Sequence, residues 1–551
     1  MRTFTLGLIG LAAFAACSDH PYDPNAPAVD PNAPVVHITS PDRGHFAGDV
    51  AMVTVTGTAT DDTAVASVTV NDVPATLNAD GTWTAQVPVT AGTNLLHAIA
   101  LDPSSNAGKE SRSVVVGPTQ PIATVVQNAI TATLSAQTFA AVGAGAGTYI
   151  KTADLESIIA PSNPVLSDGA PNGPDCLYVQ GSVTSMTVGD AQIALVPQAG
   201  GLALDAELSN VNVGMHLDYA AACINGSRDI TIAATQISVK GNLAIGVASG
   251  QFAISLDSPD VTVTGFDAEL GGLTGDIVDL LDLNDAFGPL IGWATEKFVV
   301  PMINTELDGL NQTKTISVLS SQVDISVTPA SINFTSAGGI VELNTSIRAH
   351  GDSGAFVDVT NTQPSMDLSH GFQLAVAANA ANQALTSMWS AGGLSDTLQL
   401  DNGSYGDIGT LFDSVTIAAD APPYIDASGS GLVMTIGDLM GTFKNGDTTT
   451  TEIAINAQVD VQVQTNTDGS ISLDVGQPTT YVDVLDQGVS GANELSNSQF
   501  EALTSFALAR VIAIGSGELG AIPMPSIGGV SVQNVSIAPQ TGYLVVDGTV
   551  Q

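Results

Sequence analysis

The sequence predicts an α+β protein in which long strands dominate and a few apolar helices separate them. Glycine is abundant, at 56 of 551 residues, and Val, Ile, Thr, Ala and Ser fill the stretches between turns, which is typical of strand-rich chains. Residues 34–116 alternate polar and apolar over short runs, whereas residues 177–268 alternate over much longer ones. Such long segments suit a curved, highly twisted sheet better than a compact sandwich.

Residues 35–117 are predicted to form an all-β sandwich. Runs such as VTVTGTATDD and VASVTVND are short, evenly spaced and separated by turn residues, as the strands of a sandwich are. With the DGTW turn and the ALD run, they resemble the immunoglobulin-like modules of exported bacterial proteins, and Trp83 is the predicted core anchor. Asp61, Asp62 and Asp102 offer the oxygen ligands that calcium prefers, but ordinary turn aspartates are the favoured interpretation.

The N-terminus predicts export and lipid anchoring. Arg2 precedes a short apolar run, residues 6–16, that is too brief to span a membrane. The run ends in FAAC, and small residues before a cysteine resemble a bacterial lipoprotein signal, in which Cys17 becomes the diacylated first residue. We therefore expect residues 1–16 to be a signal peptide and residues 17–34 to be a disordered tether. An ordinary export signal with a chance cysteine is the alternative.

The residues around this anchor suggest a location and a disulfide. Ser18, rather than Asp, follows the anchor cysteine, which favours sorting to the outer membrane of the bacterial cell envelope, on its periplasmic or surface face. With Cys17 lipidated, Cys176 and Cys223 remain. In an exported chain such a pair predicts a disulfide.

The charge balance narrows the possible partners. Acidic residues outnumber basic ones 54 to 12, which gives a formal net charge of −42. Binding to nucleic acid, or to an anionic membrane through a basic patch, is therefore not expected. The mean hydropathy is +0.28, yet no run of about 20 apolar residues follows the N-terminus. The apolar side chains must be buried in the fold or used to hold a ligand.

Four stretches have the apolar spacing of helices: 121–141, 289–310, about 370–391 and about 498–514. The order helix, long strands, helix occurs twice, which indicates an internal duplication. The stretch 289–310 carries an apolar stripe wider than a surface helix needs. It is therefore expected either to seal a core or to cover a pocket.

Residues 118–551 resemble the bactericidal/permeability-increasing and lipid-transfer family, which has the tubular lipid-binding fold. The resemblance lies in IPMP leading into VQNVSIAPQTGYLVVDGTV, and in SHGFQLAVAANAANQALTSMWSAGGL, which is similar to the helix that opens the family's second barrel. It implies two tandem barrels, 118–365 and 366–551, each of twisted antiparallel sheet wrapped around a long helix and joined as a boomerang. It also places the family's disulfide at Cys176 and Cys223.

The same resemblance implies an exported, lipid-anchored protein that binds or transfers phospholipid or another acyl lipid in an apolar pocket of each barrel. In the first barrel the pocket would lie between the helices 121–141 and 289–310. The implied pocket residues are Ile122, Val126, Ile130, Phe298 and Met302 in the first barrel and Leu374, Leu385, Phe506 and Val511 in the second. Ordinary core packing is the alternative for each of them. A structural or adhesive surface protein with filled barrels is the alternative for the whole chain.

Two departures limit what the resemblance implies. Members that recognise lipopolysaccharide use lysines and arginines at the tip of the first barrel, whereas Lys151, Arg228 and Lys240 are isolated here. Bactericidal activity is therefore not expected. No motif predicts an enzyme, a metal centre or a cofactor. The GDSG at 351–354 resembles the nucleophile motif of trypsin-like proteases, but Ser353 lies between two strand-like runs, where these residues favour a turn. Four aspartates between 276 and 285 are expected to be charges at a helix N-terminus. The lipid and the oligomeric state stay open.

Overall fold

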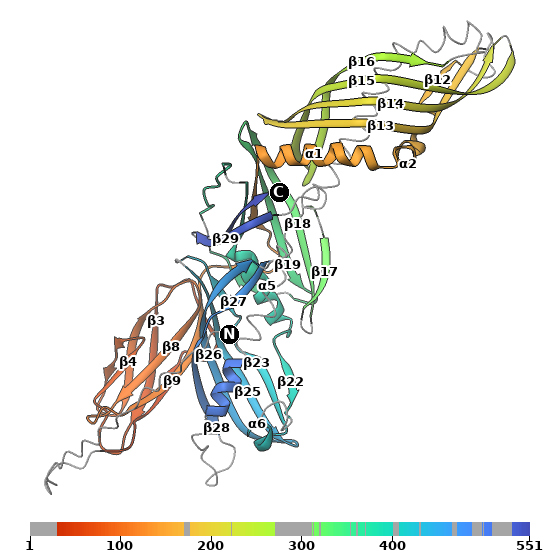
Figure 1. Ribbon diagram of the computed structural model, residues 1–551. Helices are drawn as coiled ribbons and strands as arrows, with labels where there is room; N and C mark the ends of the chain where they lie inside the picture. Colours follow the sequence, from red (N-terminus) through yellow and green to blue (C-terminus); the bar gives the residue numbers. More distant parts are fainter. Residues whose placement is uncertain are drawn as a thin grey trace, which may run out of the picture.

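The computed structural model is elongated, with a large curved sheet at one end, a second sheet in the middle, and two packed lobes at the other end (Figure 1). The structure describes residues 30–169, 177–221, 223–269, 311, 313–318, 321–352, 354–359, 362–369, 371–400, 407–428, 431–465, 471–486, 499, 501–509, 532–540 and 542–550. Strands make up 64% and helices 13% of this described part. All structural statements below concern these residues.

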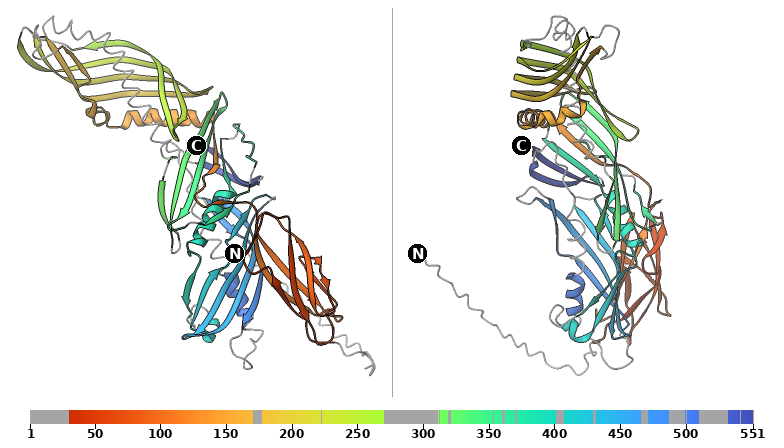
Figure 2. Two further views of the ribbon diagram at one scale, coloured as in Figure 1. Left: turned by 180° about the vertical axis from the view of Figure 1, so that it is seen from behind. Right: turned by 90° about the vertical axis from the view of Figure 1, so that its right-hand side faces the viewer.

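The predicted α+β fold of two barrels, each wrapped around a long helix, is wrong. The described part of the chain is mostly β, with several sheets and short helices. Helix α1, Ala136–Thr152, has 17 residues, whereas strand β15, Ile224–Ala248, has 25. Helix α1 runs along one side of the large sheet, beside strand β13, Tyr178–Gln198 (Figure 2). The sheet is therefore covered on one side by this helix and does not wrap around it.

The first lobe is the predicted immunoglobulin-like sandwich. It has two sheets, in the strand orders β1-β3-β7-β6 and β2-β9-β8-β4-β5. The strands are β1 Val35–Ser40, β2 His45–Gly48, β3 Met52–Thr60, β4 Ser67–Val70, β5 Val73–Pro74, β6 Thr76–Leu77, β7 Thr82–Pro88, β8 Gly92–Leu101 and β9 Ala107–Val116. Buried and exposed residues alternate along β7, and Trp83 is only 1% exposed in the core between the sheets. Trp83 is thus confirmed as a core residue.

The large sheet at the far end is an antiparallel meander of five strands, in the order β12-β13-β14-β15-β16. Besides β13 and β15, its strands are β12 Leu166–Gly169, β14 Gly201–Ala221 and β16 Gln251–Ala268. Each strand pairs with the next in sequence, and β14 and β15 pair from Gly201 to Ala221. The predicted long alternating strands are confirmed here. A short helix, α2 at Leu155–Ile159, and the turn η1 at Ala160–Ser162 follow α1 along the same side.

The middle sheet combines strands from distant parts of the chain, in the order β17-β18-β19-β11-β21-β30-β29. The strands are β11 Val126–Ser135, β17 Thr313–Val318, β18 Ser321–Thr335, β19 Gly338–Ala349, β21 Phe372–Ala377, β29 Val532–Gln540 and β30 Tyr543–Val550. Strands β11 and β21 are antiparallel neighbours, and each runs directly into a helix, α1 and α5, Ala378–Ser390. The helix predicted over 121–141 is wrong up to Ser135, because Pro121 belongs to β10, Thr119–Pro121, and residues 126–135 form β11; only residues 136–141 are helical, as the start of α1. The helix predicted over 370–391 is correct only from Ala378 onward.

The last lobe is built on a sheet in the order β22-β23-β25-β26-β27, with β24 paired to β25 and β28 paired to β26. The strands are β22 Asp396–Gln399, β23 Ser414–Ala419, β24 Tyr424–Asp426, β25 Leu432–Asn445, β26 Thr448–Thr465, β27 Ile471–Val475 and β28 Thr479–Asp486. Helix α5, helix α6 at Asp407–Leu411 and the helical residues 501–509 supply side chains to its core. The short strand β20, Ala355–Val357, pairs with β10.

Candidate functional site

The inner face of the five-stranded sheet is aliphatic. Because side chains alternate between the two faces of a strand, every second residue of β13, β14 and β15 points to the same core. The buried side chains of this face include Leu195, Leu202, Leu204, Val213, Leu217, Ile232, Ile237, Val239 and Leu243. Most outward-facing positions on the same strands are polar or small, as at Asp205 and Lys240, which form a 2.9 Å ion pair. The sheet therefore presents one apolar and one polar surface.

Helix α1 lies close to this sheet because glycines face β13. A Cβ at Gly143 would lie 2.4 Å from the carbonyl oxygen of Ile193, and a Cβ at Gly147 would lie 2.5 Å from that of Ala191. Only glycine fits such an approach. Ser135 caps the helix by accepting a hydrogen bond from the amide of Thr138 at 3.3 Å. Two glycines one helical turn apart thus allow α1 to close one side of the apolar core.

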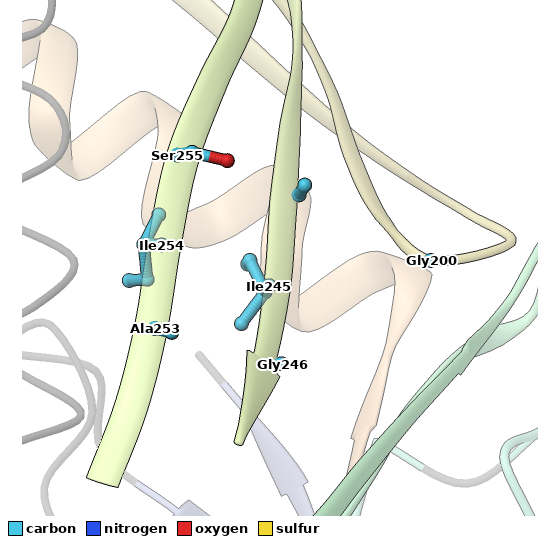
Figure 3. Close-up of a pocket in the computed structure, with 7 residues that line it drawn as sticks. Gly200, Ile245, Gly246, Ala253, Ile254 and Ser255 are labelled. Carbon is cyan, nitrogen blue, oxygen red and sulfur yellow. The ribbon is translucent and has the colours of Figure 1, made fainter. Parts of the chain in front are cut away.

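An apolar groove of about 290 Å³ opens near the end of β15 and the start of β16 (Figure 3). Its lining residues are Gly200, Ala244, Ile245, Gly246, Ala253, Ile254 and Ser255. Ile245 and Ile254 are partners in adjacent strands; Ile245 belongs to the core of the sheet and Ile254 packs against that core. A Cβ at Gly200 or Gly246 would meet no atom within 4 Å. The backbone at these two glycines therefore borders open space.

Polar side chains lie near the rim of this groove. Gln198 donates a hydrogen bond to Asn242 at 2.7 Å, and the hydroxyl of Ser255 donates to Asp257 at 3.3 Å. The volume lies near the lower end of the roughly 300–1,000 Å³ that small-molecule sites span. The groove can accept a slim apolar group, with few partners for a charged one.

The structure does not bring the predicted pocket residues together. Ile122 and Val126 are buried in a small cluster with Phe356. Ile130 and Leu374 contact the core of the large sheet, whereas Leu385 and Phe506 contact the core of the last lobe. The predicted first pocket between two helices is wrong on one side, because Val126 and Ile130 lie on strand β11. Phe298, Met302 and Val511 lie outside the described residues, and the lipid contacts of the whole set stay a prediction.

The predicted anchor and disulfide lie mostly outside the described residues. Cys17 and Cys176 are not among them, while Cys223 sits in the turn between β14 and β15 with a φ of 64°. Both the lipidation of Cys17 and the pairing of Cys176 with Cys223 stay predictions. None of the described helices is both long and apolar enough to cross a membrane.

The GDSG motif forms part of a turn that is fixed to helix α5. His350 and Gly351 make the turn after β19, as predicted, and Ser353 lies outside the described residues. Asp352 is only 2% exposed. Its carboxylate accepts hydrogen bonds from the hydroxyl of Ser387 at 2.6 Å, from the hydroxyl of Ser390 and from the amide of Gly354 at 2.7 Å. Asp352 thus holds the turn on the helix.

Helix α5 is attached to its surroundings by buried polar side chains, which sequence reasoning missed. Gln383 is fully buried, and its amide nitrogen donates to the carbonyl oxygens of Ile122 and Thr124 at 2.8 and 2.7 Å. Its amide oxygen accepts from the backbone of Ile347 at 2.9 Å. Asn382 makes two bonds of 2.9 and 2.8 Å to the backbone of Ile425. The helix is fixed by hydrogen bonds as well as by its apolar face.

The aspartates of the immunoglobulin-like domain that offer oxygen ligands fall into two separate arrangements. Asp30, Asp61 and Asp62 each place one carboxylate oxygen within 4.8 Å of the others. Asp61 accepts the amides of Thr63 and Ala64 at 2.9 and 3.0 Å, as a turn aspartate does. Asp102 instead accepts two hydrogen bonds of 2.7 Å from the backbone and side chain of Asn106. The turn interpretation of Asp61 and Asp102 agrees with these bonds.

Comparison with known proteins identifies one part of the chain. Residues 34–117 match the family model described as "Glucodextranase, domain B". The first lobe is an immunoglobulin-like domain. No curated protein matches the chain.

Two solved structures are similar to larger parts of the chain. The crystal structure of lipopolysaccharide binding protein is 13% identical with a TM-score of 0.40, covering 77% of this chain and 99% of that one. The crystal structure of P47 of Clostridium botulinum E1 is 8% identical with a TM-score of 0.25, covering 77% of this chain and 100% of that one. At these TM-scores neither likeness assigns a fold or a function to the chain.

Proposed function

We propose that this chain binds the acyl part of a lipid at the apolar inner face of the five-stranded sheet, through the groove at Ile245 and Ile254. One observation carries the proposal: an open groove is lined by Ile245, which belongs to the aliphatic core of the sheet, and by Ile254, which packs against that core. In this proposal the protein is an envelope lipoprotein of a bacterium, anchored through Cys17, that holds or transfers lipid and performs no covalent chemistry.

Burial of hydrocarbon supplies the binding energy. Each methylene group removed from water contributes about 0.8 kcal/mol, so a segment of four methylene groups contributes roughly 3 kcal/mol. Such a segment would lie along Ile245 and Ile254, the two large aliphatic side chains that line the groove. The groove accepts part of one acyl chain, and the remaining length of the chain would follow the apolar face inward.

The charges near the sheet favour a neutral or zwitterionic lipid over an anionic one. Lys151 is paired with Asp190 at 3.2 Å, and Lys240 with Asp205 at 2.9 Å. Both pairs are exposed, so each contributes little to stability, but each already has a carboxylate beside the ammonium group. An anionic headgroup would have to compete with these carboxylates in a chain of net charge −42.

The test is lipid capture by the purified full-length protein. Native mass spectrometry shows whether lipid is carried from the producing cells, and phosphatidylcholine vesicles with a fluorescent acyl chain measure uptake. Ile254→Asp should reduce uptake at least tenfold, since a carboxylate in an apolar groove disfavours hydrocarbon beside it. Ile224→Asp is the matched control, because Ile224 lies on the same sheet but is 74% exposed.

Two results would contradict the proposal. If the wild-type protein neither carries lipid nor takes it up, the apolar face is an ordinary core, and the structural or adhesive alternative is favoured. If Ile254→Asp and Ile224→Asp take up lipid equally well, the groove is not the opening through which lipid reaches the core. The circular dichroism spectra of both variants must match that of the wild type, which shows that both variants are folded when their lipid uptake is compared.

A further inference from the structure

The immunoglobulin-like domain is packed side by side with the last lobe of the chain (Figure 1). Strands β8 and β9 of the domain contact β25, and β9 also contacts β26 and β28. A Cβ at Gly437 would lie 2.4 Å from the Cβ of Ser113, and a Cβ at Gly92 would lie 2.3 Å from the ring of Tyr424. Thr93 donates a hydrogen bond to the carbonyl oxygen of Pro422 at 2.9 Å. The domain is therefore docked in one closely fitted position.

Asp438 is the centre of this interface. Its side chain is fully buried, and it accepts hydrogen bonds from donors on both sides. Arg43 donates at 2.6 Å, the amide and hydroxyl of Ser113 donate at 2.6 and 2.7 Å, and the amide of Gly44 donates at 3.2 Å. From its own lobe, Asn456 donates at 3.2 Å. Four of the five bonds come from the immunoglobulin-like domain, so Asp438 holds the domain in place.

Asp483 lies in the same interface with far fewer partners. It accepts the amide of Ser111 at 3.0 Å, and its carboxylate lies 3.5 Å from the guanidinium of Arg43. Arg43 also forms ion pairs with Asp438, at 2.6 Å, and with Glu110, at 3.5 Å. The carboxylates Glu110, Asp438 and Asp483 are each at most 12% exposed.

Positive charge at this interface is in short supply. Arg43 and Arg112 are the guanidiniums in contact with these three carboxylates, and Arg112 donates to Glu110 at 3.0 Å. Among the described residues, one buried carboxylate therefore has no cation of its own, and the distances to Arg43 identify it as Asp483. A buried charge without a full partner is costly, and a carboxyl group avoids this cost by binding a proton.

We propose that docking of the immunoglobulin-like domain on the last lobe is coupled to the uptake of one proton by Asp483. The docked state then becomes more stable as the pH falls below neutral, and less stable as the pH rises. The domain would accordingly be a proton-sensitive joint rather than a fixed or freely moving spacer.

The direction follows from the sign of the pKa shift. Burial raises the pKa of Asp483 to about 6, against the opposing effects of the Ser111 amide and Arg43. A carboxyl group whose pKa is higher when docked binds a proton on docking. The contribution of this proton to the stability of docking is therefore lost as the pH rises through about 6. It is fully present only below the ordinary pKa of a free aspartate.

Other titratable groups face the same interface and act in known directions. The pKa of Asp420 is raised by burial and, to a smaller extent, by the charge of Asp438. Protonation of Asp420 therefore favours docking in acid, as protonation of Asp483 does. Burial, and then the charge of Lys109, lowers the pKa of His97, whose ring lies 4.3 Å from that of Tyr481. His97 therefore opposes docking in acid. His37 lies 3.2 Å from Glu110 at the edge.

Hydrogen exchange of the full-length protein tests the proposal, because two amides report on docking directly. The amides of Ser111 and Ser113 donate to Asp483 and Asp438, across the interface, and not to a neighbouring strand. Asp483→Asn mimics the protonated acid. For the Ser111 and Ser113 amides, we compare the protection factor in Asp483→Asn with that in the wild type, after correction for intrinsic exchange. The ratio of the two protection factors should rise about tenfold from pH 5 to pH 7.5. Taking this ratio cancels the contributions of His97 and Asp420.

A second variant and an internal control keep the test decisive. Asp438→Asn should reduce protection at both pH values, since it removes the Arg43 ion pair. Amides of β3 and β7, inside the domain, should keep wild-type protection in both variants, which shows that the domain is still folded. An Asp483→Asn to wild-type ratio that is the same at both pH values would overturn the proposal. So would weaker protection in Asp483→Asn at pH 7.5.

Discussion

Replacing Gln383 with methionine should separate the contribution of hydrogen bonds in the last lobe from that of apolar packing. The two side chains are similar in length and volume, so the change leaves little cavity. The methionine cannot bond the carbonyl oxygens of Ile122 and Thr124 or the amide of Ile347, which Gln383 contacts at 2.7 to 2.9 Å. Three bonds at about 1 kcal/mol each give a loss of about 3 kcal/mol, and more if the buried backbone groups find no other partner.

Urea unfolding followed by tryptophan fluorescence measures this loss, because Trp389 lies on the same helix. The midpoint should fall for Gln383→Met while the slope is unchanged. Gln137→Met is the matched control, since Gln137 is also helical but exposed, and it should change stability by less than about 0.5 kcal/mol. If the two variants unfold at the same urea concentration, the bonds of Gln383 do not stabilise the fold and the reasoning fails.

Three further predictions address other parts of the chain. Gly143→Ala should lower the melting temperature of the protein, because the new Cβ would lie 2.4 Å from the carbonyl oxygen of Ile193. Gly145→Ala, at an exposed position of the same helix, should instead stabilise the protein by about 0.5–1 kcal/mol. Equal changes in melting temperature for the two variants would contradict the close packing of α1 on the sheet. Phe443→Ala removes a fully buried ring beside two other phenylalanines and should cost about 3–5 kcal/mol in urea unfolding. Cys17→Ser should move the protein from the membrane to the soluble fraction of expressing bacteria, and unchanged partitioning would refute the lipid anchor.

The strands were the most predictable part of the fold, because period-two alternation is a direct consequence of burial on one face. Strand β7, TWTAQVP, alternates in the sequence and in its burial alike, and the same holds for most of the long strand β13. The groove residues Ile245 and Ile254 belong to this alternation. It marks them as inward-facing, but it cannot show that a groove opens beside them.

The helix predicted over 121–141 failed because its apolar spacing also fits a strand. Val126, Ile130, Thr131 and Thr133 are β-branched and therefore favour strands. The partners that make β11 a strand, β19 and β21, lie more than 200 residues further along the chain. Ser135 is the local signal that could have placed the start of the helix correctly, since serine is a preferred N-cap.

The polar contacts that join the lobes could not be predicted from local pattern. Arg43 and Asp438 are separated by 395 positions, and neither lies in a recognisable motif. The one available signal was scarcity: in a chain with 12 basic residues, an arginine beside a sandwich strand is a candidate for a buried partner. Which carboxylate it meets depends on how two domains pack, which composition does not encode.

The interior of the large sheet and the surroundings of helix α5 should tolerate amino-acid substitutions differently, because α5 is fixed by buried polar side chains. The large sheet is held by aliphatic contacts that have no preferred direction, so one hydrocarbon group can replace another there without breaking a bond. Gln383 and Asn382, in contrast, bond backbone groups of three separate segments at fixed angles and distances. Exchanges among Val, Ile and Leu in the large sheet should therefore cost only about 0.5–1.5 kcal/mol each, while even a conservative exchange on α5 loosens several segments at once.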